Sequence, residues 1–517
     1  MKKNYFIMMC LVLTLLGCNN SQISNNDEIA YRSEVKSNYA ESIYLTDYVN
    51  ELNEEETKVF ANESKQNHQG YGTKGIAKSS YYTTYVNDKL VNTYMIQTAE
   101  RDPHSVCFLD VSEDKIKNGL TIKLDYFEEV SKVTLLPLKY NITPTFTNKT
   151  ISFFINDYGY YTIIPGNEFN PDKAYTIYVR KPEYIEVPYG YTLIEYKPGL
   201  HFIDPITIKS NTILYLHQGA FLLGKNPDNG SESLAFIGAS SAENIKIMGH
   251  GVLDMSPTYW HGARGIYLRN CKNIEINGVT LINSPTWTLT ATNCDNLKIE
   301  DVIIFGYRTN SDGYAICSCE DVVVKNCFAR SGDDLFEVKS YTGKESKNIL
   351  FEDCIAWPDN CRGFGIVQET YSNISNVTYN NCSLLYQLND WSEKMASFVI
   401  TAGEMGSVDK VSFTNCDLFY SSVIAIRMST GENDETMGTR NFNNKISNVT
   451  FKDCDFKYPA SGNGIVKFRD NTKEKNSIQN IIFENVTFKD KKLNNISEIN
   501  PVLENINESE FNFVTVK

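Results

Sequence analysis

The spacing of apolar residues becomes regular after Pro182. From there onward, short segments of alternating apolar and polar residues recur at a repeated interval. Alternation with a period of two predicts β-strands with one buried face. Recurrence at twenty to forty residues is typical of stacked units that bury a face only against their neighbours. We therefore expect an all-β chain with a parallel β-helix over residues 182–517. Aligned by their first buried residue, the predicted strands begin at Ile213, Ile245, Ile274, Leu297, Val322, Ile349, Val377, Val411, Val449 and Ile481.

Columns of identical residue types support this alignment. Asn or Asp stands directly before most starts, where it suits left-handed turns and hydrogen bonds between adjacent coils. Cys or Val stands five residues after most of the predicted strand starts. Three further cysteines each stand three residues before a strand start. We expect packed free thiols in these columns, because free Cys is usually buried and zinc ligands come in closer pairs. The asparagine column is Asn244, Asn273, Asn296, Asp321, Asn348, Asn376, Lys410, Asn448 and Asn480; the cysteines are Cys327, Cys354, Cys382, Cys416, Cys454, Cys271, Cys294 and Cys319.

Residues 79–181 carry a different pattern. Short alternating segments are separated by Asn-Asp and Pro-Gly turns, which favours a small β-sandwich ahead of the helix. The predicted strands cover 82–86, 120–124, 133–136, 151–155, 160–164 and 174–179. Further upstream, a Glu-rich stretch within residues 40–66 has the periodicity of a helix.

The first eighteen residues have the form of an export signal. Lys2 and Lys3 precede an apolar run that closes with Leu-Leu-Gly-Cys at Cys18. This ending resembles a bacterial lipobox, which implies lipidation of Cys18; a plain signal peptide is the alternative. Residues 19–78 would then be a tether with a short helical segment. We expect an exported lipoprotein held at the outer membrane by a lipid anchor.

The formal net charge of the 517 residues is −14. Binding of nucleic acid depends on clustered Lys and Arg side chains that neutralise phosphates. We therefore expect no nucleic-acid partner.

Three carboxylates carry the candidate chemistry: Asp312, Asp333 and Asp334. The second and third follow the first at a separation close to one coil. Adjacent coils stack roughly 4.8 Å apart, so the three should share one outer face. Trp287 and Arg362 occupy the matching slot one coil earlier and one coil later. In a carboxylate cluster one acid keeps its proton, and a glycosidase uses such an acid together with an ionised partner that activates water. The alternative is a set of turn acids on an acidic protein.

Asn310-Ser-Asp-Gly, Gly332-Asp-Asp and Val338-Lys-Ser together resemble the signature of the β-helical glycoside hydrolases of families 28 (polygalacturonases) and 49 (dextranases, isopullulanase). Residues 273–287 also resemble family 28, whereas the sandwich ahead of the helix looks more like family 49. The resemblance implies a right-handed β-helix and hydrolysis of α-linked poly- or oligosaccharides with inversion. It also implies Asp333 as the general acid, Asp312 and Asp334 as the groups that activate water, and no cofactor or metal.

The chain departs from the polygalacturonase pattern in two places. Gly363-Phe364-Gly365 stands where the polygalacturonases have Gly-His-Gly. Ile426-Arg427-Met428 only weakly resembles their Arg-Ile-Lys, which binds the galacturonate carboxylate. These departures favour a neutral glucan or galactan over a pectic backbone. The candidate residues of a sugar-binding groove are Trp287, Lys339, Arg362, Gln368, Trp391, Arg427 and His261. For His261, a structural role is favoured over contact with the substrate.

Two other functions fit the sequence. A β-helical polysaccharide lyase would use Arg or Lys as base, and the acidic cluster would then hold Ca²⁺. A non-catalytic glycan-binding lipoprotein would use the same face without turnover.

Overall fold

The computed structural model describes strand β1 (Ile29–Glu34) and residues 76–514, except 99–101, 226, 228, 342, 389–393, 432–441 and 460–465. The export signal with Cys18, the helix predicted within residues 40–66 and Trp391 lie outside the described residues. Of the helices within the described part, none has the length and apolar character needed to cross a bilayer.

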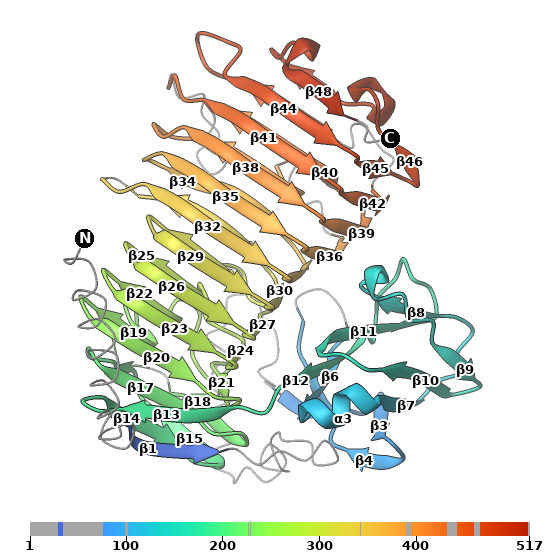
Figure 1. The fold of residues 1–517 in the computed structure, drawn as a ribbon, viewed down its shortest axis with the longest axis vertical. Helices are drawn as coiled ribbons and strands as arrows, with labels where there is room; N and C mark the ends of the chain where they lie inside the picture. Colours follow the sequence, from blue (N-terminus) through green and yellow to red (C-terminus); the bar gives the residue numbers. More distant parts are fainter. Residues whose placement is uncertain are drawn as a thin grey trace, which may run out of the picture.

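Stacked coils form a parallel β-helix with three sheets (Figure 1). Each full coil gives one strand to each sheet in turn. Sheet 1 consists of β14 (Thr192–Tyr196), β17 (Thr212–Leu216), β20 (Glu243–Met248), β23 (Lys272–Asn277), β26 (Asp295–Glu300), β29 (Glu320–Lys325), β32 (Ser346–Glu352), β35 (Ile374–Asn380), β38 (Val408–Thr414), β41 (Ile446–Lys452), β44 (Ile478–Glu484) and β48 (Phe511–Val514).

Sheet 2 follows sheet 1 along each coil. It consists of β15 (Gly199–Ile203), β18 (Ala220–Gly224), β21 (Val252–Asp254), β24 (Thr280–Ile282), β27 (Ile303–Phe305), β30 (Phe328–Ser331), β33 (Ile355–Pro358), β36 (Ser383–Gln387), β39 (Asp417–Ser421), β42 (Asp455–Tyr458), β45 (Thr487–Phe488) and the antiparallel β46 (Lys491–Lys492).

Sheet 3 completes the coil. It consists of β16 (Ile206–Thr207), β19 (Ala235–Ser240), β22 (Arg264–Arg269), β25 (Leu289–Thr292), β28 (Tyr314–Cys317), β31 (Phe336–Ser340), β34 (Phe364–Thr370), β37 (Ala396–Ala402), β40 (Ile424–Thr430), β43 (Val466–Asp470) and β47 (Val502–Glu504). Two short 3₁₀ helices, η4 (Ile496–Ile499) and η5 (Glu508–Glu510), lie near the last coil.

The register of sheet 1 agrees with the predicted strand starts from Ile245 onward. The start at Ile213 is wrong by one residue, because Thr212 pairs with Ile245 and Ile213 with Lys246. Ile213 faces outward and packs with Tyr215 against the strand β13 (Tyr184–Pro188). With both faces of β17 buried, the alternation that sets the register disappears.

The asparagine column forms the expected ladder. Its residues have left-handed φ values near 55°, and the amides of Asn273 and Asn296 each donate to the preceding coil over 3.0 Å. Lys410 keeps the left-handed φ but interrupts the chain of amides, so Asn448 bonds to Asp409 instead. The prediction for the thiols is confirmed for the described cysteines, all of which are buried and free.

A β-sandwich precedes the helix. One sheet has the order β4 (Lys89–Val91), β3 (Tyr82–Val86), β7 (Leu120–Tyr126), β10 (Thr150–Ile155), β9 (Thr145–Thr147), and the other β2 (Ile76–Lys78), β5 (Tyr94–Ile96), β6 (His104–Asp110), β12 (Tyr175–Arg180), β11 (Gly159–Pro165), β8 (Val133–Leu136). A short helix α3 (Glu113–Asn118) and a 3₁₀ turn η3 (Leu138–Tyr140) connect strands, and β1 pairs antiparallel with β13. The sandwich thus begins at Ile76, three residues before the predicted start.

The sequence pattern does not predict strand β6, whose seven residues, His104–Asp110, do not alternate between apolar and polar types and are all buried. Cys107 and Leu109 belong to the core of the sandwich, whereas Val106 and Phe108 belong to a second core shared with sheet 2. The six-stranded sheet therefore lies between the other sandwich sheet and the helix, as Figure 1 shows.

Buried charges join the two parts. Arg330 at the end of β30 is 1% exposed, forms a bidentate ion pair with Asp359 at 3.1 Å, and contacts His104 of β6 at 2.8 Å. Asp110 at the end of β6 meets His250 at 2.5 Å. These contacts, together with the shared apolar core, fix the sandwich against the helix.

Candidate active site

Four side chains occupy one slot on successive coils. Trp287, Asp312, Asp334 and Arg362 each lie two residues before a sheet 3 strand, and those strands pair in register. The backbone N–H of Gly313 donates to the carbonyl of Asp334 over 2.7 Å, so the alignment extends back into the turn. The slot therefore brings an aromatic ring, two acids and a guanidinium into one line at the turn between sheets 2 and 3.

Asp333 adjoins this line and is the most exposed of the three acids. Its carboxylate accepts the backbone N–H of Asn310 at 2.7 Å and that of Asp334 at 2.9 Å. Burial, followed by the charge of Asp334, raises the pKa of Asp333 above its ordinary value. The structure therefore gives Asp333 both a fixed orientation and a tendency to hold a proton.

Asp334 and Asp312 have different partners. Asp334, 4% exposed, accepts from the Arg362 guanidinium at 2.7 Å and from the Arg362 backbone N–H at 2.9 Å. Charge-assisted pairs of this kind are among the stronger hydrogen bonds of proteins. Asp312 is 3% exposed, and burial, then the charges of Asp333 and Glu337, raise its pKa well above the ordinary range.

Lys339 is surrounded by carboxylates. Its Nζ lies 3.8 Å from Asp312, 3.3 Å from Glu337 and 3.4 Å from Glu369. Burial lowers the pKa of Lys339, but the three acids outweigh burial and raise the pKa well above the ordinary value. Burial also raises the pKa of Glu337 to about 8. We call Lys339, Asp312, Glu337 and Glu369 the lysine cluster.

Sequence reasoning misses Glu337 and Glu369. Glu337 stands two residues before Lys339, so it shares a strand face with it, and that period is the available signal. Glu369 lies where the pairing of β31 with β34 shifts register between Val338 and Ser340. Gln368, a predicted groove residue, lies in the same irregular stretch and is 8% exposed.

Trp287 and Arg427 lie on the outer side of sheet 3 at different distances from the acids. The Trp287 ring is flanked by Lys339 at 4.0 Å and Arg264 at 4.3 Å, both cation–π contacts. Arg427 is three coils beyond Glu337 in the same column, roughly 14 Å along the helix at the strand spacing. Arg427 therefore belongs to the same face but not to the acid cluster.

Both ring nitrogens of His261 are engaged. Nε2 lies 3.1 Å from the Asn310 side chain and Nδ1 lies 2.6 Å from Glu232. Because the backbone N–H of Asn310 binds Asp333, His261 braces the segment that orients this acid. The neighbouring Trp260 supports the same segment by donating to the carbonyl of Thr309 at 3.0 Å.

Phe364 points into the coil rather than toward the acids. It is fully buried and stacks on Phe336 at 5.1 Å and on Phe398 at 5.9 Å. The residue that stands in place of the expected histidine thus contributes packing.

A parallel β-helix with an acid cluster at the turn between its second and third sheets is the architecture that the sequence resemblance to β-helical glycoside hydrolases implies. Residues 181–454, more than half of the chain, match the family described as glycosyl hydrolases family 28, and the chain belongs to that family.

Individual relatives are distant. Polygalacturonase QRT2 of Arabidopsis thaliana is 22% identical over 199 residues, 35% of this chain and 44% of the relative. Probable exopolygalacturonase B of Emericella nidulans is 26% identical over 163 residues, 28% of this chain and 35% of the relative. The chain thus spans less than half the length of these relatives. Dex49A from Penicillium minioluteum is 12% identical with a TM-score of 0.55 over 85% of this chain and 95% of that chain, which shows a shared fold.

Proposed function

We propose that the protein hydrolyses α-linked glycosidic bonds of a neutral poly- or oligosaccharide with inversion at the anomeric carbon. The observation that carries the proposal is the alignment of Asp312 and Asp334 in one slot, with Asp333 beside them. Stacked coils bring three acids to one outer face, where one can act as a general acid and another as a general base.

Asp333 acts as the general acid in this proposal. It is held by two backbone N–H groups, is more exposed than its neighbours, and has a raised pKa, so it can donate a proton to the leaving oxygen. Trp287 in the neighbouring slot is half-buried between Lys339 and Arg264, and the exposed part of its ring can contact a sugar.

Asp312 and Asp334 activate the water that attacks the anomeric carbon from the other face. Arg362 holds Asp334 in place through two hydrogen bonds. Burial and the neighbouring acids raise the pKa of Asp312, and the charge of Lys339 acts against this by favouring the ionised form that accepts a proton.

The lysine cluster supports a neutral substrate. A lysine that grips a uronate needs its positive charge free, whereas Lys339 already faces three carboxylates. The charge of Lys339 is therefore already engaged within the cluster and is not free to pair with a uronate carboxylate. The buried position of Phe364 adds to the case, because no histidine side chain reaches the acids from that position.

The test is a panel of neutral α-glucans and α-galactans alongside polygalacturonate, with proton NMR of the first product anomer. We expect hydrolysis of a neutral substrate with inverted product. Cleavage of polygalacturonate alone would contradict the neutral substrate, and a retained anomer would contradict the roles given to Asp312 and Asp334.

The same assay examines the lyase alternative. A lyase product would be unsaturated and absorb ultraviolet light, and chelation of Ca²⁺ would stop its formation. Potential ligand atoms of Asp333, Asp334 and Cys361 lie within 4.8 Å of one another, but a thiol is a poor Ca²⁺ ligand. We therefore expect activity to survive EDTA.

We also propose that the protein is an outer-membrane lipoprotein anchored through Cys18. The support is the Leu-Leu-Gly-Cys ending of the leader. Labelling with a fatty acid analogue should mark the wild-type protein and leave Cys18→Ser unlabelled. Equal labelling of both would contradict this anchor.

A further inference from the structure

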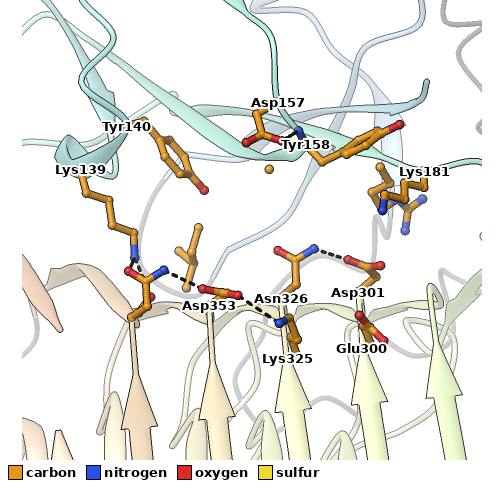
Figure 2. Close-up of a pocket in the computed structure, with 14 residues that line it drawn as sticks. Lys139, Tyr140, Asp157, Tyr158, Lys181, Glu300, Asp301, Lys325, Asn326 and Asp353 are labelled. Atoms are coloured by element: carbon orange, nitrogen blue, oxygen red, sulfur yellow. Dashed lines mark hydrogen bonds and ion pairs between the residues drawn. The ribbon is translucent and has the colours of Figure 1, made fainter. Parts of the chain in front are cut away.

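A cavity of about 390 Å³ lies between the sandwich and the corner where sheet 1 turns into sheet 2 (Figure 2). Its floor consists of Asp301, Asn326, Asp353 and Asn381, which repeat on successive coils with left-handed φ values between 49° and 56°. Tyr140, Asp157, Tyr158 and Lys181 face this floor from the sandwich. We call this cavity the junction site.

Hydrogen bonds between the two parts hold the walls of the junction site. The Tyr160 hydroxyl donates to the carbonyl of Asn326 at 2.7 Å, and the Arg180 guanidinium donates to that of Gly278 at 2.7 Å. Lys139 donates to the carbonyl of Asn381 at 2.6 Å. The cavity is therefore a formed space beside a tight interface, and a polar space of this size holds water or a polar ligand.

The charges that line the junction site are balanced. Four basic side chains, Lys139, Arg180, Lys181 and Lys325, are matched by four acidic ones, Asp157, Glu300, Asp301 and Asp353. An ion of either sign would meet like charges, whereas a neutral molecule with many hydroxyls can donate to carboxylates and accept from ammonium groups. The volume is within the roughly 300–1,000 Å³ of small-ligand sites.

Two aromatic rings complete this chemistry. Tyr140 and Tyr158 line the roof, and aromatic rings can pack against the C–H face of a sugar. Lys181, an exposed side chain with its Nζ 5.5 Å from the Tyr158 ring centroid, places an ammonium donor beside that ring.

We propose that the junction site binds one or two neutral sugar units of a glycan, separately from the acid cluster. The acid cluster lies at the turn between sheets 2 and 3, and the junction site lies at the turn between sheets 1 and 2, so sheet 2 separates them. A glycan held at the junction site raises the effective concentration of neighbouring chain segments at the acid cluster. The choice of a neutral ligand follows from the cavity itself, and the proposal rests on the proposed function only for the effect on hydrolysis at the acid cluster.

The experiment measures binding to the full chain in the Asp333→Asn background by isothermal titration calorimetry. The probes are isomaltotriose, maltotriose and α-1,4-galactotriose, with trigalacturonate as the charged comparison. Two substitutions should weaken the junction site. Asp353→Asn removes a charge at a turn position where neighbouring coils already carry Asn, and Lys181→Ala shortens an exposed side chain. Their matched controls are Asp453→Asn, at the equivalent turn position outside the cavity, and Lys89→Ala on β4.

We expect a second binding event for at least one neutral probe, weakened about tenfold by each junction substitution, as loss of one charge-assisted hydrogen bond predicts. Neither control should change it. In the otherwise wild-type chain, the same substitutions should lower the rate on a polymer several-fold while leaving a short chromogenic glycoside unaffected.

A single binding event in the parent protein, or junction variants that bind every probe as the parent does, would overturn the junction site. If the neutral probes bind in the junction-dependent way but the wild-type chain hydrolyses none of them, the proposed hydrolase function fails while the junction site stands. If hydrolysis occurs with only one binding event, the junction site fails alone.

Discussion

Asp312 and Asp334 are separated by one coil of the chain and occupy the same position on adjacent coils. Each lies two residues before a paired residue of sheet 3, Tyr314 and Phe336, and the N–H of Gly313 donates to the Asp334 carbonyl at 2.7 Å. The two acids nevertheless differ in environment. Arg362 neutralises Asp334, whereas Asp312 shares Lys339 with two glutamates.

Replacing Asp333 by Asn should remove the general acid. We expect hydrolysis to fall by roughly 10²–10⁴-fold, the usual contribution of a positioned acid, with no loss of thermal stability. Reducing-sugar release from the substrate found in the panel measures the effect. Asp321→Asn is the control, because Asn occupies this ladder position on most other coils and Asp321 accepts the Asn348 amide there. Equal activity in the two variants would contradict the role of Asp333.

Replacing Lys339 by Met should destabilise the fold. Removal of the cation leaves Asp312, Glu337 and Glu369 facing one another, and breaking a buried ion pair in this way costs about 3–5 kcal/mol. Urea denaturation at pH 9, above the pKa of about 8 of Glu337, measures the full loss, which should shrink at pH 5, where Glu337 holds its proton. Lys347→Met, at an exposed pair with Glu320, should have no measurable effect. A stable Lys339→Met protein would show that the cluster is not held by this charge.

The stability of the wild-type protein should fall as pH rises between about 4.5 and 8 because of Glu337. Burial raises the pKa of this carboxyl to about 8 in the folded state from 4.5, so between these values the folded protein binds a proton that the unfolded chain has released. Glu337→Gln should reduce this dependence. Denaturation midpoints at pH 5, 6.5 and 8 for both proteins provide the measurement, and parallel curves would refute the assignment.

Restoring the polygalacturonase pattern with Phe364→His should not create activity on pectic substrates. Phe364 is part of an interior stack with Phe336 and Phe398, so the change leaves a gap and buries a polar ring. We expect a loss of about 3 kcal/mol in the free energy of unfolding. Phe364→Leu, which stays apolar, should lose less. Gain of polygalacturonate cleavage by the His variant would be the contrary result.

The described cysteines should be inert in the native protein. All are free and buried, so a thiol reagent should label them only after denaturation, and a reducing agent should not shift the melting temperature. Cys354→Val, which copies the residue found at this column on other coils, should leave the melting temperature nearly unchanged. A marked drop on reduction would indicate a disulfide.

Much of the β-helix could be predicted because its repeat appears in several sets of equivalent positions: the apolar strand starts, the asparagines before them and the cysteines after them. The starts at Ile274 and Leu297 coincide with asparagines that hydrogen-bond between coils, so two independent signals agree. Where an outer face is also apolar, as at Ile213, the alternation fails and the predicted register slips by one residue. Strand β6 escapes prediction for the same reason, since sandwich and helix bury it on both faces.

The acid cluster could be located because the separation of Asp312 from Asp334 equals one coil at this point. The sequence predicts only part of the lysine cluster. It predicts Lys339 as a groove residue, but Glu369 contacts Lys339 because of a register shift in β34, and no spacing in the sequence reveals such an irregularity. The engagement of His261 with the side chains of two other coils likewise depends on turns far away in the sequence, which no local pattern connects.

The contact of Arg330 with His104 and Asp359 has a consequence for how this architecture can change. A chain that lost the sandwich would expose an apolar sheet and leave the guanidinium without its imidazole partner, on the segment that leads directly into Asp333. The β-helix is therefore not independent of the sandwich. Gene fusions that exchange its N-terminal partner must supply a new neighbour for that arginine, so the two halves are expected to be inherited together.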